Sequence, residues 1–257
     1  MIAVDITGLT VEYGGMTALK VDKLRLQNGV VNCVLGPNGA GKSSLLRAVA
    51  GIVNYKGTIT ITAGGTKIDK RDIHRFVSYV ADIQPSSIRL RVREALLSAR
   101  YPCSPGFFYT VKDFEYVEKV SRALGVTDLL DRTLNELSSG ELQRVLLAMA
   151  LVKDPLVVLL DEPDTHLDLY NKSRLSVLVK SIAADKLVTV STHDPVFASL
   201  VCDRIVLLDK GIVLRDFKAE ELTEHVSTLE RVFKTRLVAT TLSGRSMLVP
   251  DYTTTLS

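Results

Sequence analysis

The 257-residue sequence predicts an α/β domain built on a mostly parallel sheet. Short apolar runs rich in β-branched residues alternate with segments of helical periodicity, which is typical of parallel strands connected by helices. The run 156–160 is apolar throughout rather than alternating, as expected for a strand covered on both faces in the middle of such a sheet. The other expected strands are residues 30–35, 57–62, 76–80, 186–191 and 204–209, and the expected helices include residues 42–53, 140–152 and 169–183.

A helical segment interrupts this alternation. From residue 88 to 150 the sequence shows helical signals and no strand, and residues 111–124 carry an apolar stripe that is expected to face the core. The stripe consists of Phe114, Val117, Val120 and Leu124. After residue 211 the pattern changes to a Glu-rich helix and a strand pair, 236–241 with 246–249. We therefore expect an α/β core from residues 1–87 and 138–215, a helical subdomain from 88–137 and a small C-terminal appendage from 216–257.

Composition argues against several classes of protein. The 32 basic and 29 acidic residues leave a net charge of +3, too small to predict a nucleic-acid groove. No apolar run reaches the ~18 residues of a membrane-spanning helix, and the N-terminus lacks the features of a signal peptide, so any membrane role is expected to come through a partner. The three cysteines are far apart and form no CxxC pair, which favours reduced thiols in the cytosol, with Cys33 in the core.

A glycine-rich loop follows the strand 30–35 and opens the next helix. Its sequence, Gly36-Pro37-Asn38-Gly39-Ala40-Gly41-Lys42-Ser43, matches the phosphate-binding pattern G-x-x-x-x-G-K-[ST] in the strand–loop–helix setting that its mechanism requires. Glycines let the backbone N–H groups approach phosphate oxygens, and the helix N-terminus adds partial positive charge. Lys42 is expected to reach the β and γ phosphates, and the Ser43 hydroxyl to ligate Mg²⁺. A merely tight strand–helix turn would explain the glycines but not the Lys-Ser pair.

Two adjacent carboxylates, Asp161 and Glu162, follow the apolar run 156–160. Ligands bind at the carboxyl edge of an α/β sheet, and placing two charges there is costly unless they have a function. Asp161 is expected to hold Mg²⁺, directly or through a water, and Glu162 to take the proton from the water that attacks the γ-phosphate. A helix N-cap would account for one of these carboxylates but hardly for both.

The order of the motifs resembles the ATP-binding-cassette (ABC) ATPase family over nearly the whole chain. The phosphate loop is followed by the signature segment Leu137-Ser138-Ser139-Gly140-Glu141-Leu142-Gln143-Arg144, the Asp-Glu-Pro strand end, Leu167-Asp168 and Thr192-His193-Asp194. This resemblance implies a P-loop NTPase core with N-terminal antiparallel strands and a helical subdomain. It also implies two cassettes that face each other head to tail, with ATP between one phosphate loop and the other's signature segment.

The resemblance implies a role for each matching residue. ATP would contact the loop residues 36–43, Ser44 and Tyr13, the aromatic that stacks on adenine. The ATP of the partner cassette would be contacted by Ser138, Ser139, Gly140 and Glu141. Asp168 would contact the partner cassette, and His193 would contact the γ-phosphate beside Glu162.

The sequence departs from the family pattern at three places. Ser139 and Glu141 replace the third and fifth residues of the usual Leu-Ser-Gly-Gly-Gln. A glutamine normally follows the strand that ends near Val80. Asp82 occupies its place here, and Gln84 lies two residues later. Either side chain could serve as the oxygen ligand near Mg²⁺, and the sequence leaves both open; of the two, Gln84 is the expected ligand.

Further segments resemble the ATPase subunits of importers for iron–siderophore complexes, haem and vitamin B12. They are residues 92–95, 100–102, 165–169 and the C-terminal pattern from 222 to 250. The resemblance implies a second copy of the chain, a membrane permease and, indirectly, an extracellular substrate-binding protein as partners, no nucleic acid, and a position at the cytoplasmic face of the membrane through the permease. An exporter's ATPase subunit and a soluble non-transport ABC ATPase remain alternatives, and the cargo is not readable from the ATPase.

Overall fold

A computed structural model describes residues 1–81, 89–103, 108–242 and 245–255 of the chain. Asp82 and Gln84, the two alternatives for the oxygen ligand near Mg²⁺, lie outside the described residues.

The central sheet has ten strands in the order β5-β4-β1-β2-β10-β9-β3-β8-β7-β6. Strands β9, β3, β8, β7 and β6 run parallel to one another, so their carboxyl ends meet at one edge. This confirms the predicted parallel sheet, and all five residues of β7 are buried as its sequence predicts. The bounds are β3 (Val31–Leu35), β6 (Val77–Val80), β7 (Val157–Asp161), β8 (Leu187–Thr192) and β9 (Arg204–Asp209).

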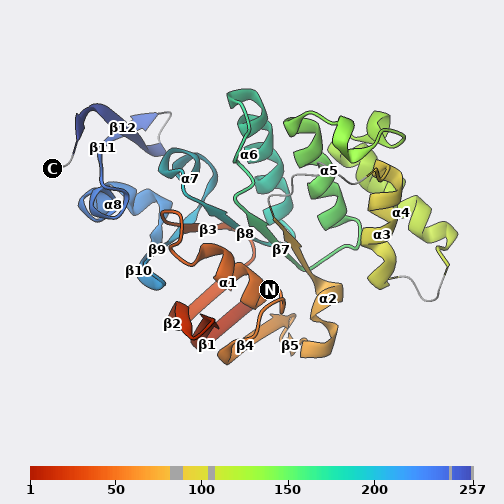
Figure 1. Ribbon diagram of the computed structural model, residues 1–257, viewed down its shortest axis with the longest axis horizontal. Coiled ribbons are helices and arrows are strands. Elements are labelled where there is room, and N and C mark those ends of the chain that lie inside the picture. The colour runs from red at the N-terminus through yellow and green to blue at the C-terminus, as the bar shows by residue number, and fades with distance from the viewer. Residues whose placement is uncertain (82–88, 104–107, 243–244, 256–257) are drawn as a thin grey trace.

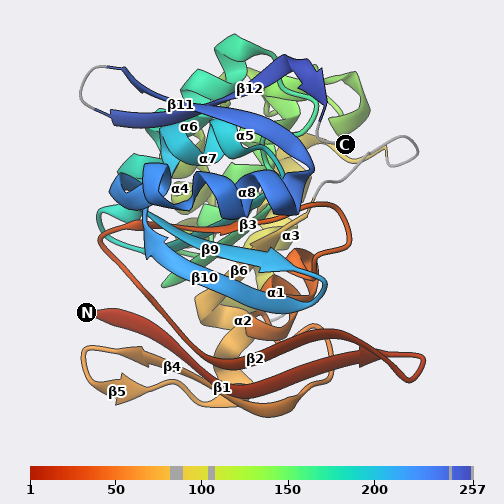
Figure 2. The same ribbon diagram turned by 90° about the vertical axis from the view of Figure 1, so that its left-hand side faces the viewer.

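The other half of the sheet is antiparallel except for a short parallel pairing of β10 with β2, and β1, β2, β4 and β5 curl away as a separate layer (Figure 2). Strand β1 pairs with both β2 and β4, and β10 pairs antiparallel with β9. Alternating buried and exposed residues along β1 and β2 are typical of strands with one covered face. Strand β10 continues to residue 218, beyond the core boundary expected at residue 215. The bounds are β1 (Ile2–Tyr13), β2 (Met16–Gln27), β4 (Lys56–Ala63), β5 (Thr66–Lys67) and β10 (Ile212–Lys218).

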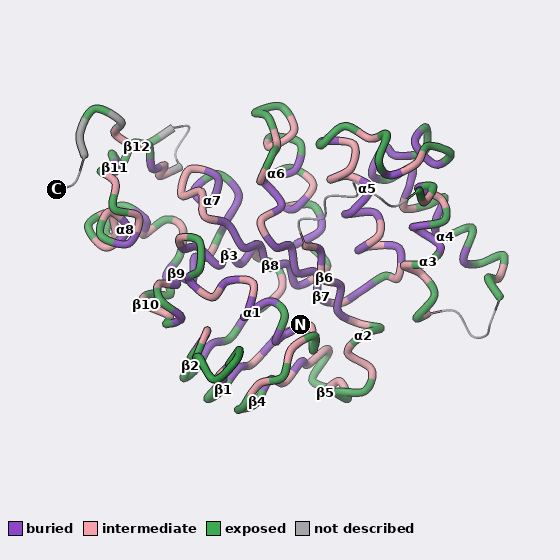
Figure 3. The backbone as a smooth tube through the Cα atoms, viewed as in Figure 1, coloured by how far each residue is buried: buried purple, intermediate pink, exposed green. Residues whose placement is uncertain are grey.

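Helices cover both faces of the parallel strands (Figure 1). Helix α1 (Lys42–Val49) lies between the two halves of the sheet, and α5 (Ser139–Leu151), α6 (Leu169–Ala183) and α7 (Pro195–Val201) cover the opposite face. The side chains of β3 divide accordingly: Cys33 packs in the cluster of the outer helices, and Val34 packs in the cluster that contains α1. Buried segments therefore concentrate along the central strands (Figure 3).

The described helices between β6 and α5 are α3 (Val92–Arg100) and α4 (Val111–Leu124), and both pack against α5. Short 3-10 turns complete it, namely η2 (Tyr101–Cys103), η3 (Thr127–Leu129) and η4 (Leu134–Glu136). Val117 and Leu124 are buried, as the predicted stripe requires. The expectation for Phe114 is wrong, because this side chain is 45% exposed on α4.

The C-terminal residues form a small lobe on the opposite end of the molecule from α4 (Figure 1). It contains η5 (Ala219–His225), α8 (Val226–Phe233) and a separate two-stranded sheet of β11 (Thr235–Leu242) and β12 (Arg245–Thr255). Leu229 and Leu248 are buried and belong to the outer-helix core cluster, so the lobe packs on the core rather than standing free. The elements η1 (Lys70–Asp72) and α2 (Ile73–Phe76) connect β5 to β6.

The cysteines depart from expectation. Cys33 on β3 and Cys202 at the end of α7 are joined as a disulfide across 169 residues of sequence, so the expectation of unpaired thiols is wrong for this pair. Their residues meet because the chain returns from α7 to β9, the strand beside β3. Cys33 is fully buried, as predicted, and Cys103 is free. None of the described helices is long and apolar enough to cross a membrane.

Candidate nucleotide-binding site

The glycine-rich loop joins β3 to α1 at the carboxyl edge of the parallel strands. Two glycines are required by close approach of the backbone. A Cβ on Gly36 would lie 2.3 Å from the carbonyl oxygen of Leu208, and one on Gly41 would lie 2.9 Å from that of Ala18. Gly41 also has a φ of 100°, which only glycine adopts readily. The sequence pattern thus reflects a loop folded tightly over the strand ends.

Helix α1 presents free amides at its first turn. The first helical bond runs from Leu45 N–H to the Gly41 carbonyl at 3.0 Å, so the N–H groups of Lys42, Ser43 and Ser44 precede the helical ladder. The N-cap, Gly41, has no side chain that could accept from them. Together with the helix dipole, these donors form a site for an anion.

Lys42 is buried at the centre of the loop, with 3% of its side chain exposed. Its Nζ donates to the carbonyl oxygens of Gly36 at 2.8 Å and Pro37 at 3.0 Å. The same Nζ lies 3.1 Å from Glu162 Oε1. The loop cation and the expected general base are therefore in direct contact, although 120 residues separate them in sequence.

A cavity of about 480 Å³ opens over this loop. Its walls include four residues that sequence reasoning missed: Thr17 and Ala18 from β2, and Lys210 and Gly211 from the β9–β10 turn. No local motif marks these four, because they reach the loop through the pairing of β2 with β10. The remaining lining residues are Gly39, Gly41, Lys42, Ser43, Ser44 and Glu162.

Glu162 occupies a strained position just past the end of β7. Its φ is 50°, a left-handed conformation that is uncommon for a residue with a side chain. Its N–H donates to the Ser191 carbonyl at 3.1 Å and hydroxyl at 3.0 Å, which fixes the turn against β8. Glu162 Oε2 lies 3.2 Å from Nδ1 of His193. The carboxylate is thus held between Lys42 and His193.

Asp161 is 93% covered and hydrogen-bonded at both oxygens. Ser191 Oγ donates to Oδ1 at 2.5 Å and the Tyr79 hydroxyl donates to Oδ2 at 2.7 Å. Arg47 Nε in turn donates to the Tyr79 hydroxyl at 3.1 Å. Burial raises the pKa of Tyr79 to about 12, and the bond to Asp161 acts in the same direction. Tyr79 therefore remains a donor at neutral pH and orients the carboxylate.

The residues present fit a nucleoside triphosphate with Mg²⁺. The loop amides and Lys42 supply donors for phosphate oxygens, and the cavity lies directly over them. Ser43 and Asp161 supply the hydroxyl and carboxylate oxygens that Mg²⁺ takes alongside phosphate. This set of donors can bind a phosphorylated ligand and position a water near Glu162.

The expected trans-acting residues lie away from this cavity. Ser138 caps α5: its N–H and hydroxyl both donate to Glu141 Oε2 at 2.8 Å, and these bonds hold the pKa of Glu141 below its usual range. Asp168 caps α6 by accepting from Asn171 N–H at 2.8 Å. Tyr13 is the last residue of β1 and is 43% exposed. The described cavity is lined by none of the residues Tyr13, Ser138, Ser139, Gly140, Glu141 and Asp168.

The fold and this loop define a nucleotide-binding P-loop protein. The sequence profile of the family described as ABC transporter matches residues 19–165. The chain therefore belongs to the ABC transporter family, as its ATP-binding component.

Curated relatives are similar over most of the chain. The petrobactin import ATP-binding protein of Bacillus subtilis is 28% identical, with 94% of this chain and 97% of that protein covered. The cobalamin import ATP-binding protein of Halobacterium salinarum is 33% identical over 93% of this chain, which spans 61% of that longer protein. An inward-facing ABC transporter assigned to the metal-chelate type has a TM-score of 0.84 at 23% identity, with 98% of both chains covered, which shows the shared fold.

Proposed function

We propose that the chain is the ATP-binding and ATP-hydrolysing subunit of an ABC transporter and powers import of a metal-chelate or cobalamin-like substrate through a partner permease. The observation that carries the ATPase proposal is the contact of Lys42 with Glu162 at 3.1 Å beneath the phosphate cavity. This contact supports a site in which a cation binds the γ-phosphate and a general base lies next to the same phosphate. The names of the relatives from Bacillus and Halobacterium support the class of substrate.

Each site residue has a proposed role. Lys42 and the loop amides bind the phosphates, and Tyr13 stacks on adenine. Bound Mg²⁺, held through Ser43 and Asp161, would neutralise phosphate charge. Glu162 accepts the proton of the attacking water, and His193 orients Glu162 and contacts the γ-phosphate. Tyr79 and Ser191 keep Asp161 in place through the hydrogen bonds described above.

Lys42→Ala is expected to weaken ATP binding about tenfold to a hundredfold, because a charge-assisted contact contributes roughly 1.5–3 kcal/mol. A titration of the nucleotide-free chain with ATP measures this. The substitution also leaves Glu162 without its cation, so part of the loss could be repulsion between carboxylate and phosphate.

The double variant Lys42→Ala/Glu162→Gln separates the two effects, because the loss that persists without the carboxylate belongs to Lys42. Lys56→Ala, an exposed lysine paired with Glu12, is the matched control and should bind ATP normally. Unchanged ATP affinity in Lys42→Ala would refute the phosphate-loop assignment.

The helical subdomain is the proposed docking surface for the permease. Large apolar side chains are exposed at one end of it, although a solvent-facing helix end would ordinarily be polar. Phe108 is 87% exposed and Val111 is 74% exposed, and the rings of Tyr101 and Tyr109 meet edge to face at 6.4 Å. A protein partner that covers these side chains would hold the chain at the cytoplasmic face of the membrane.

Phe108→Asp is expected to abolish copurification of a membrane protein with the tagged chain from detergent-solubilised native membranes. The reason is that a charge would have to be buried at the centre of an apolar contact. Val238→Asp is the matched control: Val238 is 55% exposed, but it lies on β11 at the far end of the molecule (Figure 1). Retention of the membrane protein by Phe108→Asp, or its absence from the wild-type preparation, would contradict the proposed surface.

A further inference from the structure

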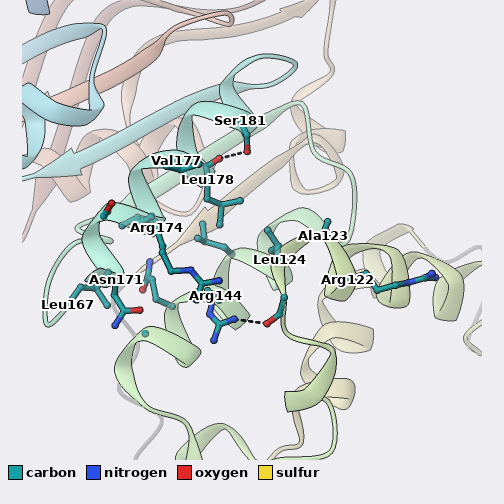
Figure 4. A pocket seen from close by; sticks show the side chains of 16 residues that line it. Arg122, Ala123, Leu124, Arg144, Leu167, Asn171, Arg174, Val177, Leu178 and Ser181 are labelled. Carbon is teal, nitrogen blue, oxygen red and sulfur yellow. Dashed lines mark hydrogen bonds between the residues drawn. The ribbon is translucent and has the colours of Figure 1, made fainter. Parts of the chain in front are cut away.

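A second cavity, of about 580 Å³, lies between the helical subdomain and the core, away from the phosphate loop. Its walls come from the end of α4, from α5 and from α6 (Figure 4). The volume is in the range of small-molecule sites. None of its lining residues coincides with those of the nucleotide cavity.

The cavity is positively charged. Arg144 on α5 and Arg174 on α6 extend toward one another across it (Figure 4). None of the described side chains that line it is acidic. Arg174 has no hydrogen bond or ion pair with any described residue and contacts the ring of Tyr170 at 5.7 Å. Glu141 interacts with the charge of Arg144 but is not among the lining residues, so the cavity wall itself carries positive charge only.

The wall on α5 also contains unsatisfied donors. Nε of Arg144 and Nε2 of Gln143 are buried and have no hydrogen-bond partner among the described residues. Arg144 uses one Nη to donate to the Gly125 carbonyl at 2.5 Å, which holds the guanidinium at the cavity edge.

Much of the remaining lining is apolar, although Asn171, Ser173 and Ser181 also contribute to it. Leucine side chains from α4, α5 and α6 form the walls beside the guanidinium groups, and they are Leu124, Leu147, Leu175 and Leu178. A ligand that satisfies both parts has an anionic group at one end and a hydrocarbon body at the other. Paired guanidinium groups match the planar geometry of a carboxylate.

We propose that this cavity binds a small organic carboxylate with an apolar body, and that the carboxylate bridges Arg144 and Arg174. Such a ligand would connect α5, which begins at the signature segment, to α6, which begins after Asp168. Occupancy would therefore restrain the helical subdomain relative to the core. The proposal concerns a site separate from the nucleotide cavity, and binding there requires no ATP turnover.

Octanoate is a suitable probe, with 1-octanol as the uncharged analogue of the same chain length. Isothermal titration of the nucleotide-free chain should show octanoate binding, and Arg174→Gln should weaken it at least about tenfold because a charged hydrogen bond is lost. Hydrogen exchange should show that octanoate protects amides of α5 and α6 in the wild-type chain but not in Arg174→Gln.

Arg122→Gln is the matched control. Arg122 also lines the cavity, but it points away from it and lies 3.6 Å from Glu118 on the same helix, so octanoate affinity should be unchanged (Figure 4). Arg174 is exposed and not hydrogen-bonded to described residues, so its substitution should not disturb the fold. The proposal is overturned if octanoate does not bind, if it binds Arg174→Gln as tightly as wild type, or if 1-octanol binds equally well. Lys42→Ala should bind octanoate normally, so failure of the ATPase proposal is distinguishable from failure of this one.

Discussion

Glu162→Gln is expected to lower ATP hydrolysis by roughly 10²–10⁴-fold while leaving ATP bound. Glutamine preserves the shape of the side chain but has no basic oxygen to accept the proton of the attacking water. The structure adds a reason for retained binding. Glu162 pairs with Lys42 at 3.1 Å, and loss of the carboxylate charge releases Lys42 for phosphate. ATP affinity should therefore equal or exceed that of the wild-type chain.

Single-turnover hydrolysis and equilibrium ATP binding, measured on the same preparation, test both halves of this expectation. Glu136→Gln is the control, because Glu136 is a glutamate that caps a short helix through Thr133, outside the nucleotide cavity. Hydrolysis by Glu162→Gln near the wild-type rate would show that another group is the base. A large loss of ATP binding would instead assign Glu162 a role in forming the phosphate site.

The parts of the site that are contiguous in sequence could be predicted from it. Residues 36–43 form one loop, and Asp161 and Glu162 end one strand, so their types and spacing already determine which groups come together. The parallel sheet then brings β3 and β7 to the same edge, since β8 pairs with both. Contact between Lys42 and Glu162 follows from that order of strands rather than from either motif.

Contacts set by strand register could not be predicted. Tyr79 reaches Asp161 because β6 lies parallel to β7 and Tyr79 pairs with Leu159, two residues before the carboxylate. Ser191 pairs directly with Asp161. A Tyr or Ser in an apolar strand carries no local sign of such a role. The disulfide of Cys33 with Cys202 has the same origin, because it depends on β9 returning beside β3.

The exposure of individual residues on a helix could not be predicted from the helical pattern either. Phe114 fits the stripe of α4 by spacing, yet it is 45% exposed, whereas Val117 and Leu124 of the same stripe are buried. The pattern reports which residues can share a face. Which of them a neighbouring helix covers depends on tertiary packing.

Ser138→Arg is expected to abolish hydrolysis while ATP binding to the same chain remains nearly intact. Ser138 is not among the residues that line the nucleotide cavity, and it begins α5, the helix on which α3 and α4 pack. One chain therefore presents a phosphate loop without the signature segment beside it. We propose that a second copy supplies Ser138 and Gly140 to the γ-phosphate, where an arginine would block the approach. Unaltered ATP binding also shows that loss of the Ser138 cap has not unfolded the chain.

Mixing Ser138→Arg chains with Lys42→Ala chains tests the composite site directly. In a mixed dimer, one site combines both lesions, and the other combines the intact phosphate loop of the first chain with the intact signature segment of the second. At an ATP concentration too low to fill the Lys42→Ala site, activity should therefore reappear in the mixture although neither variant alone hydrolyses ATP, and activity per chain should rise with total protein concentration because the copies must associate. Lys42→Ala chains mixed equally with Glu162→Gln/Lys42→Ala chains control for protein concentration and should stay inactive, because no dimer in that mixture has an intact phosphate loop. Hydrolysis by Ser138→Arg at the wild-type rate, proportional to chain concentration down to high dilution, would show that a single chain completes its own site.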